Sequence, residues 1–236
     1  MAFNSVRRAE DLVAARAALV STYDKTGLAD LVRGIVVACP GIRFYSTGGT
    51  YDAIEEALGG LGAGSMAGAK LTKVSDYTGQ PEMKGGLVKT LDWKIYLGLL
   101  AESGDAAHAA DLERSGAVAF DMMIANLYPF AEASADPSSS PEDLRQNIDI
   151  GGPSMLRAAA KNYLRVASVS SPAQYGALLS ELRETGGRTR LETRRRLAAE
   201  AFGLVSRFDA AVSARLGGLE PAVVAAAYGL SGAFSK

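Results

Sequence analysis

Short apolar runs and longer helical patterns alternate along most of this chain, and this alternation restricts the fold more than any other feature. The runs are rich in β-branched and aromatic residues, and they lie at 17–22, 42–47, 71–77, 120–130 and 165–171. Strands and helices that take turns at this spacing predict an α/β fold with a mainly parallel sheet covered on both faces. In such sheets ligands bind at the carboxyl ends of the strands.

A long helical pattern and a short tail follow the alternating part. The pattern covers residues 188–216, and its arginine-rich start is typical of a solvated helix face. Residues 217–236 form an apolar, glycine-punctuated C-terminal tail that either docks on a neighbouring element or frays. Because no linker separates independent units, residues 1–236 are predicted to form a single domain.

Residues 131–147 have no clear period and are rich in Ser, Pro, Ala and Asp. This composition is typical of a solvated surface loop. A long unstructured connection in a compact domain is also often functional, so a mobile lid over a neighbouring site is the alternative.

The composition favours a small ligand over a macromolecular partner. A formal net charge of -1 lacks the basic excess of nucleic-acid binders, so no nucleic-acid partner is expected. No run of about 18 apolar residues occurs, which predicts a soluble protein without a membrane partner. The single cysteine, Cys39, fits a reducing cytoplasm. With one histidine, His108, no metal dependence is expected.

Two glycine-bearing turns follow the first two predicted strands. "STGGT" at 46–50 opens a helix, so its backbone N–H groups and the helix dipole favour an anion such as phosphate. A tight turn with Thr50 as helix N-cap explains the same residues equally well. "TYDKTGL" at 22–28 places Lys25 at the end of the first strand, where it either faces the same anion or lies on the surface.

Two further loops carry polar side chains. Residues 81–91 hold Lys84 and Lys89 beside glycines, where an ammonium either faces a polar ligand or is solvated. "NLYPF" at 126–130 ends the most apolar strand. Asn126 there offers a donor and an acceptor that could read a carboxamide, and Tyr128 offers a hydroxyl, although a strand end with a packed aromatic ring is the alternative.

"NIDIGGPSMLRAAAKNY" at 147–163 is the most informative stretch. Gly151 and Gly152 form a turn that opens a helix, and Asp149 lies just before it, where it can accept from the N-terminal N–H groups. Lys161 follows on the same helix. The spacing leaves open whether Asp149 and Lys161 meet, or whether the helix simply exposes solvated cations.

Together and in this order, the motifs resemble the inosine-monophosphate cyclohydrolase domain of the bifunctional purine-biosynthesis enzyme, which also carries an aminoimidazole-carboxamide ribotide transformylase domain. Seven segments within residues 18–216 carry the resemblance: "DKTGL", "STGGT", "VSDYTGQPEM", "VKTL", "NLYPF", "NIDIGGPSMLRAAAKN" and "AFGLVSRFDAAVSARL". Each is weak alone, but seven in register are specific. The transformylase part does not follow here, so formyl transfer is not expected of this chain.

The resemblance implies a methylglyoxal-synthase-like fold with three α/β/α layers, a homodimer and a cytoplasmic enzyme that needs no cofactor. Its small-molecule partner would be a purine nucleotide: 5-formamidoimidazole-4-carboxamide ribotide would be closed to inosine monophosphate (IMP) with loss of water. The substrate-binding residues carried over by motif are Lys25, Thr26, Gly27, Ser46, Thr47, Gly48, Gly49, Thr50, Thr90, Asn126, Gly151 and Gly152.

Four residues are carried over as catalytic. An amide nitrogen is a poor nucleophile, so the attack needs a proton acceptor and donors for the developing oxyanion. Asp149 and Lys161 are expected to move protons, with Lys89 and Tyr128 assisting the oxyanion. Much of the rate could also come from holding the two reacting groups of one molecule together.

The chain departs from the family at several positions. The family's "RVKTLHPKVHGG" reads "LVKTLDWKIYLG" here, so an arginine and two histidines are lost, and a tyrosine replaces a common serine in the first turn; the residues present are Leu87, Asp92, Trp93, Tyr96 and Tyr23. Losing a cation should weaken attraction for an anion unless Lys84 or Lys94 compensates. The alternatives are therefore the same ring closure on an altered nucleotide, as in specialised nucleoside biosynthesis, or a catalytically silent phosphate-ligand-binding domain.

Overall fold

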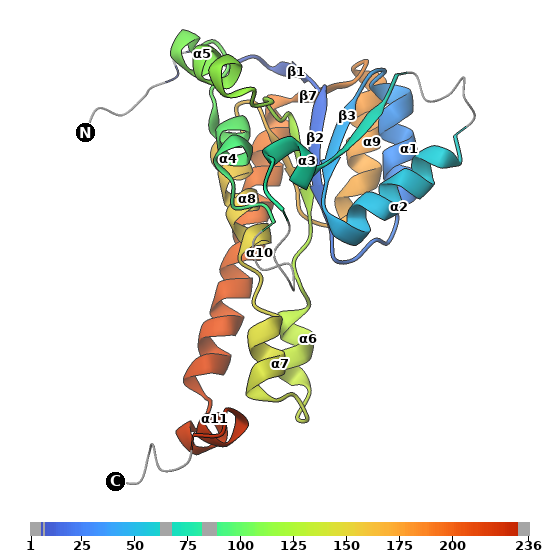
Figure 1. The fold of residues 1–236 in the computed structure, drawn as a ribbon. Helices are drawn as coiled ribbons and strands as arrows, with labels where there is room; N and C mark the ends of the chain where they lie inside the picture. The colour runs from blue at the N-terminus through green and yellow to red at the C-terminus, as the bar shows by residue number, and fades with distance from the viewer. Residues whose placement is uncertain (1–5, 7, 62–67, 82–88, 231–236) are drawn as a thin grey trace.

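A five-stranded parallel sheet forms the centre of the molecule (Figure 1). The computed structural model describes residues 6, 8–61, 68–81 and 89–230. Within them the strand order is β4-β3-β2-β5-β6, and each neighbouring pair is parallel. The strands are β2 (Ala17–Ser21), β3 (Arg43–Ser46), β4 (Lys70–Lys73), β5 (Met122–Ala125) and β6 (Ala167–Val169). The predicted α/β fold with a parallel sheet is confirmed.

Helices cover both faces of the sheet and give three layers. One face carries α1 (Leu28–Ala38), α2 (Gly48–Gly59) and α9 (Tyr175–Glu184), and the other carries α4 (Trp93–Leu100), α8 (Gly151–Lys161) and α10 (Leu191–Gly217). Side chains of β2 alternate between the two cores: Ala18 and Val20 pack with the first set, and Ala17 and Leu19 with the second. A strand buried on both faces explains the continuous apolar run in the sequence.

Residues 131–147, expected to lack regular structure, contain short helices instead. The chain forms α6 (Phe130–Ala135) and then α7 (Pro141–Gln146). Ser140 and Asp143 make a reciprocal capping box around the start of α7, and Leu144 is fully buried. A local cap and one buried anchor therefore order a segment whose composition indicated a loop.

Other elements also differ from the prediction. The run at 71–77 is a strand only to Lys73 and continues as α3 (Val74–Thr78). The segment around His108, for which no element was predicted, forms α5 (Ala106–Ser115). A separate antiparallel pair joins β1 (Leu12–Ala14) to β7 (Arg188–Arg190). A short 3-10 turn, η2 (Pro172–Gln174), precedes α9.

The arginine-rich start of α10 is only partly a solvated face. Arg195 and Arg196 are exposed, but Arg194 is fully buried. Its guanidinium donates to main-chain carbonyls just before β1, within β7 and after α8, at residues Glu10, Asp11, Tyr163, Leu164 and Thr189. This arginine is therefore a buried cross-link rather than part of the surface.

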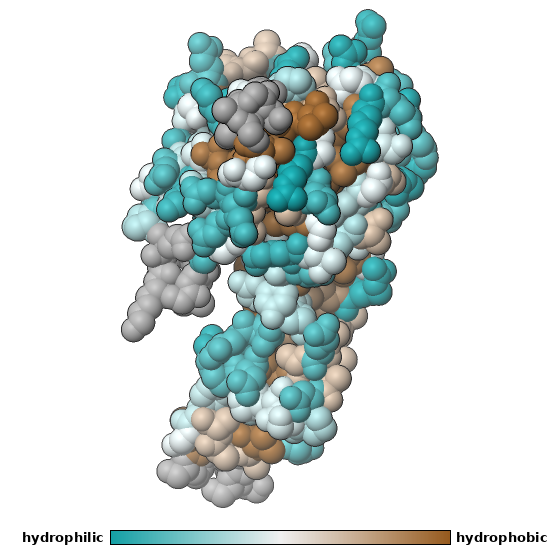
Figure 2. Space-filling view, turned by 90° about the vertical axis from the view of Figure 1, so that its right-hand side faces the viewer, coloured by the Kyte–Doolittle hydropathy of each residue, from teal (hydrophilic) through white to brown (hydrophobic). Residues whose placement is uncertain are grey.

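The far half of α10 projects from the body with α6, α7 and α11 (Pro221–Ala227) beside it (Figures 1 and 2). The tail docks through α11, because the Tyr228 hydroxyl donates to Glu142 on α7 at 2.9 Å. Among the helices that the structure describes, none alone has the length and hydropathy to cross a membrane; α10 and α11 meet that test only as a pair, bent by 92°.

Candidate functional site

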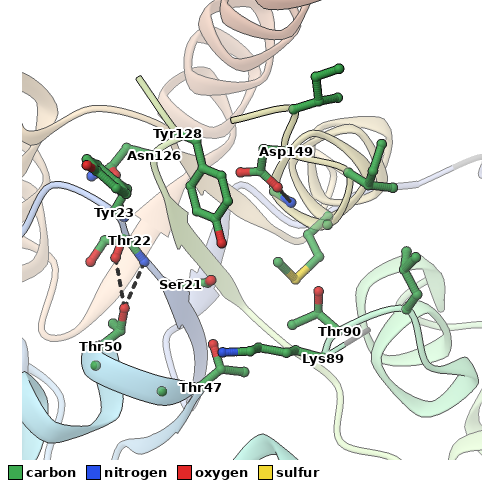
Figure 3. A pocket seen from close by; sticks show the side chains of 18 of the residues that line it. Ser21, Thr22, Tyr23, Thr47, Thr50, Lys89, Thr90, Asn126, Tyr128 and Asp149 are labelled. Carbon is green, nitrogen blue, oxygen red and sulfur yellow. Dashed lines mark hydrogen bonds between the residues drawn. The ribbon is translucent and has the colours of Figure 1, made fainter. Parts of the chain in front are cut away.

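A pocket of about 870 Å³ opens at the carboxyl ends of β2, β3 and β5 (Figure 3). The segment before α4, the end of α7 and the start of α8 form its remaining walls. The lining residues are Ser21, Thr22, Tyr23, Lys25, Thr47, Gly48, Gly49, Thr50, Lys89, Thr90, Leu91, Asn126, Tyr128, Arg145, Gln146, Ile148, Asp149, Ile150, Gly151, Gly152 and Met155. Its volume is in the range of small-molecule sites.

One end of the pocket is built for an anion. A Cβ placed on Gly48 would lie 3.3 Å from the Lys89 Nζ, and one on Gly49 would lie 3.9 Å from the Lys25 Nζ. Both ammonium groups therefore stand at the N-terminus of α2, where the helix dipole and backbone N–H groups already favour negative charge. Gly48 has a φ of +45°, a conformation that L side chains rarely adopt.

Two side chains fix the turn that carries Lys25. The Thr50 hydroxyl donates to the Thr22 carbonyl at 2.9 Å and accepts from the Thr22 N–H at 3.1 Å. Asn126 Oδ1 accepts from the N–H groups of Tyr23 and Asp24 at 2.7 and 2.8 Å, and its Nδ2 donates to the Asp24 carbonyl at 2.7 Å. Asn126 lines the pocket, but its polar atoms also hold this turn in place.

Asp149 is the one carboxylate among the described residues that line the pocket. The Gly152 N–H donates to its Oδ1 at 2.9 Å, which orients the group at the start of α8. Burial raises the pKa of the Asp149 carboxyl, against the lowering effect of the backbone N–H groups beside it. The Tyr128 hydroxyl points into the same space (Figure 3). A carboxylate with a raised pKa beside a phenol suits proton transfer.

Most of the expected site residues line this pocket; the four that do not are Thr26, Gly27, Ser46 and Lys161. Thr26 and Gly27 lie outside it, after the turn of Lys25. Ser46 is fully buried, and its hydroxyl donates to the Val20 carbonyl at 2.8 Å, so it ties β3 to β2. The roles assigned to the pocket-lining residues stay predictions. Lys84 and Leu87 lie outside the described residues.

Lys161 is separated from Asp149. It is the last residue of an 11-residue helix that begins in the pocket at Gly151, so about 15 Å of helix lies between them. Lys161 lines a second hollow of about 630 Å³ between α4, α8 and α10, together with Arg157 and Phe202. The open question of whether Asp149 and Lys161 meet is thus answered: in this chain they face different hollows.

Several pocket residues escaped the sequence analysis as candidates, and the three largest polar ones are Arg145, Gln146 and Tyr23. Arg145 and Gln146 enter from the end of α7, which looked like a loop. Tyr23, noted only as a departure, stands in the pocket wall with its ring 5.6 Å from that of Tyr128, and both rings are exposed. The one available signal was position: each residue lies within a few residues of a recognised motif.

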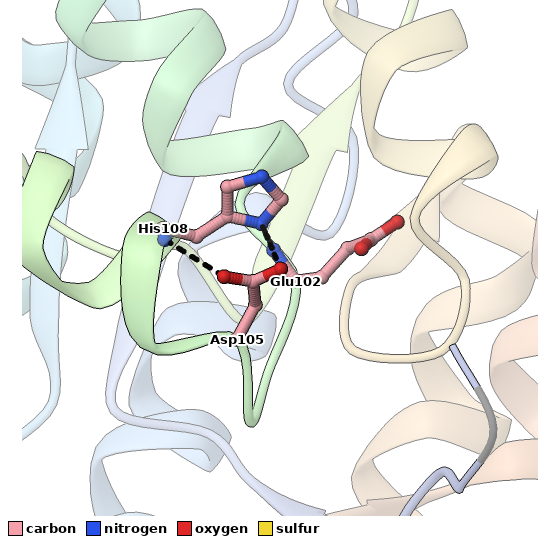
Figure 4. A group of neighbouring side chains, drawn as sticks. All are labelled: Glu102, Asp105 and His108. Atoms are coloured by element: carbon pink, nitrogen blue, oxygen red, sulfur yellow. Dashed lines mark hydrogen bonds and ion pairs between the residues drawn. The ribbon is translucent and has the colours of Figure 1, made fainter. Parts of the chain in front are cut away.

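A possible metal-binding group lies elsewhere. Within the described ranges the only cluster of suitable side chains is Glu102, Asp105 and His108, between α4 and α5 (Figure 4). The His108 Nδ1 already accepts from the Glu102 N–H at 3.1 Å, so a metal bound through Nδ1 would have to displace this bond. The expectation that no metal is needed stays a prediction.

Gly152 leaves no room for a side chain. A Cβ there would meet the Asp149 Oδ2 at 2.5 Å and a Leu127 methyl at 2.8 Å. Gly152→Ala is expected to displace the Asp149 carboxylate and lower the rate of the pocket's reaction by about 10², because small misplacements of reacting groups are costly. Gly59→Ala is the matched control, since nothing lies within 4 Å of that Cβ. Equal kinetics for the two variants would show that Asp149 needs no such placement.

Two family models match the chain. The "MGS-like domain" model matches residues 27–154, and the "AICARFT/IMPCHase bienzyme" model matches residues 159–231. The first covers more than half of the chain and most of the pocket. The chain belongs to the MGS-like domain family. The MGS-like match includes the N-terminus of α2 and Asp149, and the second match includes all of α10. The resemblance to the cyclohydrolase part of the bifunctional enzyme is confirmed.

Several known proteins are similar to this MGS-like chain. The bifunctional purine biosynthesis protein PurH of Chlorobium luteolum is 45% identical over 210 residues, which are 89% of this chain and 38% of that protein. The PurH of Rhizobium johnstonii is 40% identical over 205 residues, 87% of this chain and 36% of that protein. The chain thus spans little more than a third of these relatives. The crystal structure of ForH matches with a TM-score of 0.73 at 30% identity, covering 86% of this chain and 97% of that one.

Proposed function

We propose that this protein is an IMP cyclohydrolase, which closes the purine ring of 5-formamidoimidazole-4-carboxamide ribotide with loss of water. The observation that carries the proposal is the polarity of the pocket. Two ammonium groups and a helix N-terminus occupy one end, and a half-buried carboxylate with a raised pKa occupies the other. The substrate has the matching polarity, with a phosphate at one end and the reacting groups at the other.

The binding steps follow from the geometry. The 5'-phosphate lies at the N-terminus of α2, between Lys25 and Lys89, where N–H groups and two cations share its charge. Lys89 is thereby assigned to the phosphate rather than to the oxyanion. With the phosphate anchored, the base extends toward Asp149 and Tyr128, and the enclosed volume favours folding of the formyl group against the carboxamide.

Ring closure then needs one proton acceptor. The carboxamide nitrogen attacks the formyl carbon, a C–N bond forms, and the nitrogen loses a proton to the Asp149 carboxylate. The Asp149 carboxyl returns this proton to the formyl oxygen, which becomes a hydroxyl. The C–O bond then breaks while the former formamide nitrogen loses its own proton and forms the C=N bond; this second proton, passed on by Asp149 or the Tyr128 hydroxyl, converts the hydroxyl to water. Lys161 has no direct part in these steps, since it faces another hollow.

The test is turnover. Purified protein is mixed with 5-formamidoimidazole-4-carboxamide ribotide, and the formation of IMP is followed by absorbance. A rate far above that of the enzyme-free blank is expected, and a rate equal to the blank would contradict the proposal. A cytoplasmic, homodimeric enzyme without cofactor or metal belongs to the same proposal. Gel filtration tests the homodimer, and activity in metal-free buffer without added cofactor tests the other requirement.

A second candidate function is the same ring closure on an altered nucleotide. Tyr23 favours it, because an exposed ring in the pocket wall stands where the family commonly has serine, in edge contact with Tyr128. Replacing Tyr23 by serine is the discriminating change. If the native substrate is the common ribotide, the variant should keep or gain activity on it; if the wild type is inactive on that substrate and the variant active, the altered nucleotide is favoured.

A further inference from the structure

We propose that Arg145 is a ligand-binding cation of this pocket, which Glu142 holds in the free protein and which negatively charged or carbonyl oxygens of the nucleotide recruit. The inference rests on the proposed binding of a nucleotide, and it adds a residue that lies outside the family motifs quoted above. It begins from position, since Arg145 lines the same pocket as Lys25, Lys89 and Asp149.

The charge balance of the pocket supports this role. Its charged lining residues in the described part of the chain are the cations Lys25, Lys89 and Arg145 and the carboxylate Asp149. The resemblance calls for an arginine where this chain has Leu87. Arg145 supplies the pocket with a guanidinium from α7, and a guanidinium offers a planar fork of donors suited to phosphate or carbonyl oxygens.

Glu142 is the group with which the ligand would have to compete for the Arg145 guanidinium. Both Arg145 Nε and Nη2 donate to the Glu142 carboxylate, at 2.7 and 2.6 Å. Hydrogen bonds from Arg145, Gln146 and Tyr228 hold the pKa of Glu142 at about 2, so the carboxylate is ionised under all ordinary conditions. Its other two partners remain in place when Arg145 leaves, which lowers the cost of release.

The backbone beneath Arg145 is fixed, so only a side chain has to move. The capping box of Ser140 and Asp143 anchors the start of α7, and Leu144 is buried next to Arg145. The Arg145 side chain itself is 58% exposed, and an exposed ion pair is worth little in solution. A ligand with concentrated negative charge in the pocket can therefore compete for it.

The test compares ligand affinity in matched variants by isothermal titration calorimetry. The probes are IMP, inosine and ribose 5-phosphate. Arg145→Gln is expected to weaken IMP binding by about tenfold, as for a lost hydrogen bond to a charged group. Arg114→Gln is the control, because Arg114 also pairs with a carboxylate three residues away at 2.6 Å, on α5 away from the pocket. Glu142→Gln should strengthen binding about threefold by releasing Arg145.

The outcomes separate this proposal from the proposed function. If Arg145→Gln binds IMP as Arg114→Gln does, or if Glu142→Gln weakens binding as Arg145→Gln does, the pair is structural and the proposal is overturned. Two outcomes support the proposal. If Arg145→Gln also loses affinity for ribose 5-phosphate, Arg145 contacts the phosphate; if it also loses affinity for inosine but not for ribose 5-phosphate, Arg145 contacts the base. Because affinity is measured without turnover, a catalytically inactive protein that binds IMP still tests the role of Arg145. If none of the probes binds the wild type, the proposal for Arg145 is overturned.

Discussion

Replacing Asp149 by asparagine is expected to slow ring closure by about 10³ while nucleotide binding is retained, since a positioned general base contributes roughly 10² to 10⁴. Asparagine keeps an oxygen that can accept from the Gly152 N–H, so the turn at the start of α8 is preserved. The amide cannot accept the proton of the attacking nitrogen. Initial rates and IMP affinity together provide the measurement.

The pH dependence gives this prediction a second readout. Burial raises the pKa of Asp149, so wild-type activity should fall on acidification at a pH above the usual carboxyl range, and the residual rate of Asp149→Asn should lack this limb. Asp209→Asn, an exposed change on α10, is the control and should behave as wild type. Activity of Asp149→Asn within a few fold of wild type would remove Asp149 from the chemistry.

The same raised pKa has a consequence for stability. The folded protein binds a proton at Asp149 more tightly than the unfolded chain does, so ionisation of this group opposes folding. The penalty is absent below the unfolded pKa of about 3.9 and is complete once the pH exceeds the raised folded value. Asp149→Asn should therefore be more stable than wild type at pH 7 and gain nothing near pH 3, as measured by urea unfolding.

Replacing Arg194 by methionine is expected to lower the free energy of unfolding by about 3 kcal/mol, because buried carbonyls then lose their donors. Arg194 is fully buried, and its five carbonyl partners belong to the N-terminal segment, the turn after α8 and β7. One side chain thus holds together segments about 180 residues apart in the sequence.

The neighbouring arginine supplies the control for that prediction. Arg195 is on the same turn of α10, but it is exposed and pairs with Glu192 at 2.8 Å. Arg195→Met should change the unfolding free energy by about 0.5 kcal/mol or less. Urea denaturation of both variants decides the matter, and similar losses would contradict the cross-linking role of Arg194.

The strands and main helices were predictable because their signals are local. A continuous apolar run such as that around Met122 reads as a strand buried on both faces, and the structure has β5 there. The same reasoning did not predict the helices within residues 131–147, because α7 depends on a capping box and on the single buried Leu144. Arg194 and Arg195 look alike in the sequence, and only tertiary packing separates the buried one from the exposed one.

The site was predictable where a motif ends a strand. One residue separates Gly48 and Gly49 from the end of β3, so their place at the sheet edge follows from the topology. The motif led us to expect Lys161 among the catalytic residues, whereas α8 places it at a second hollow away from Asp149. Tyr23 and Arg145 could not be recognised as candidates, because the walls of a pocket depend on the packing of elements that the sequence does not place.

The most direct test of the account is the crystal structure of this protein bound to IMP. We predict that the phosphate lies at Gly48 and Gly49 between the ammonium groups of Lys25 and Lys89, with the purine ring beside Asp149. A nucleotide bound in the hollow around Lys161, or bound with its phosphate toward Asp149, would contradict the central claim that ring closure takes place at the carboxyl ends of β2, β3 and β5.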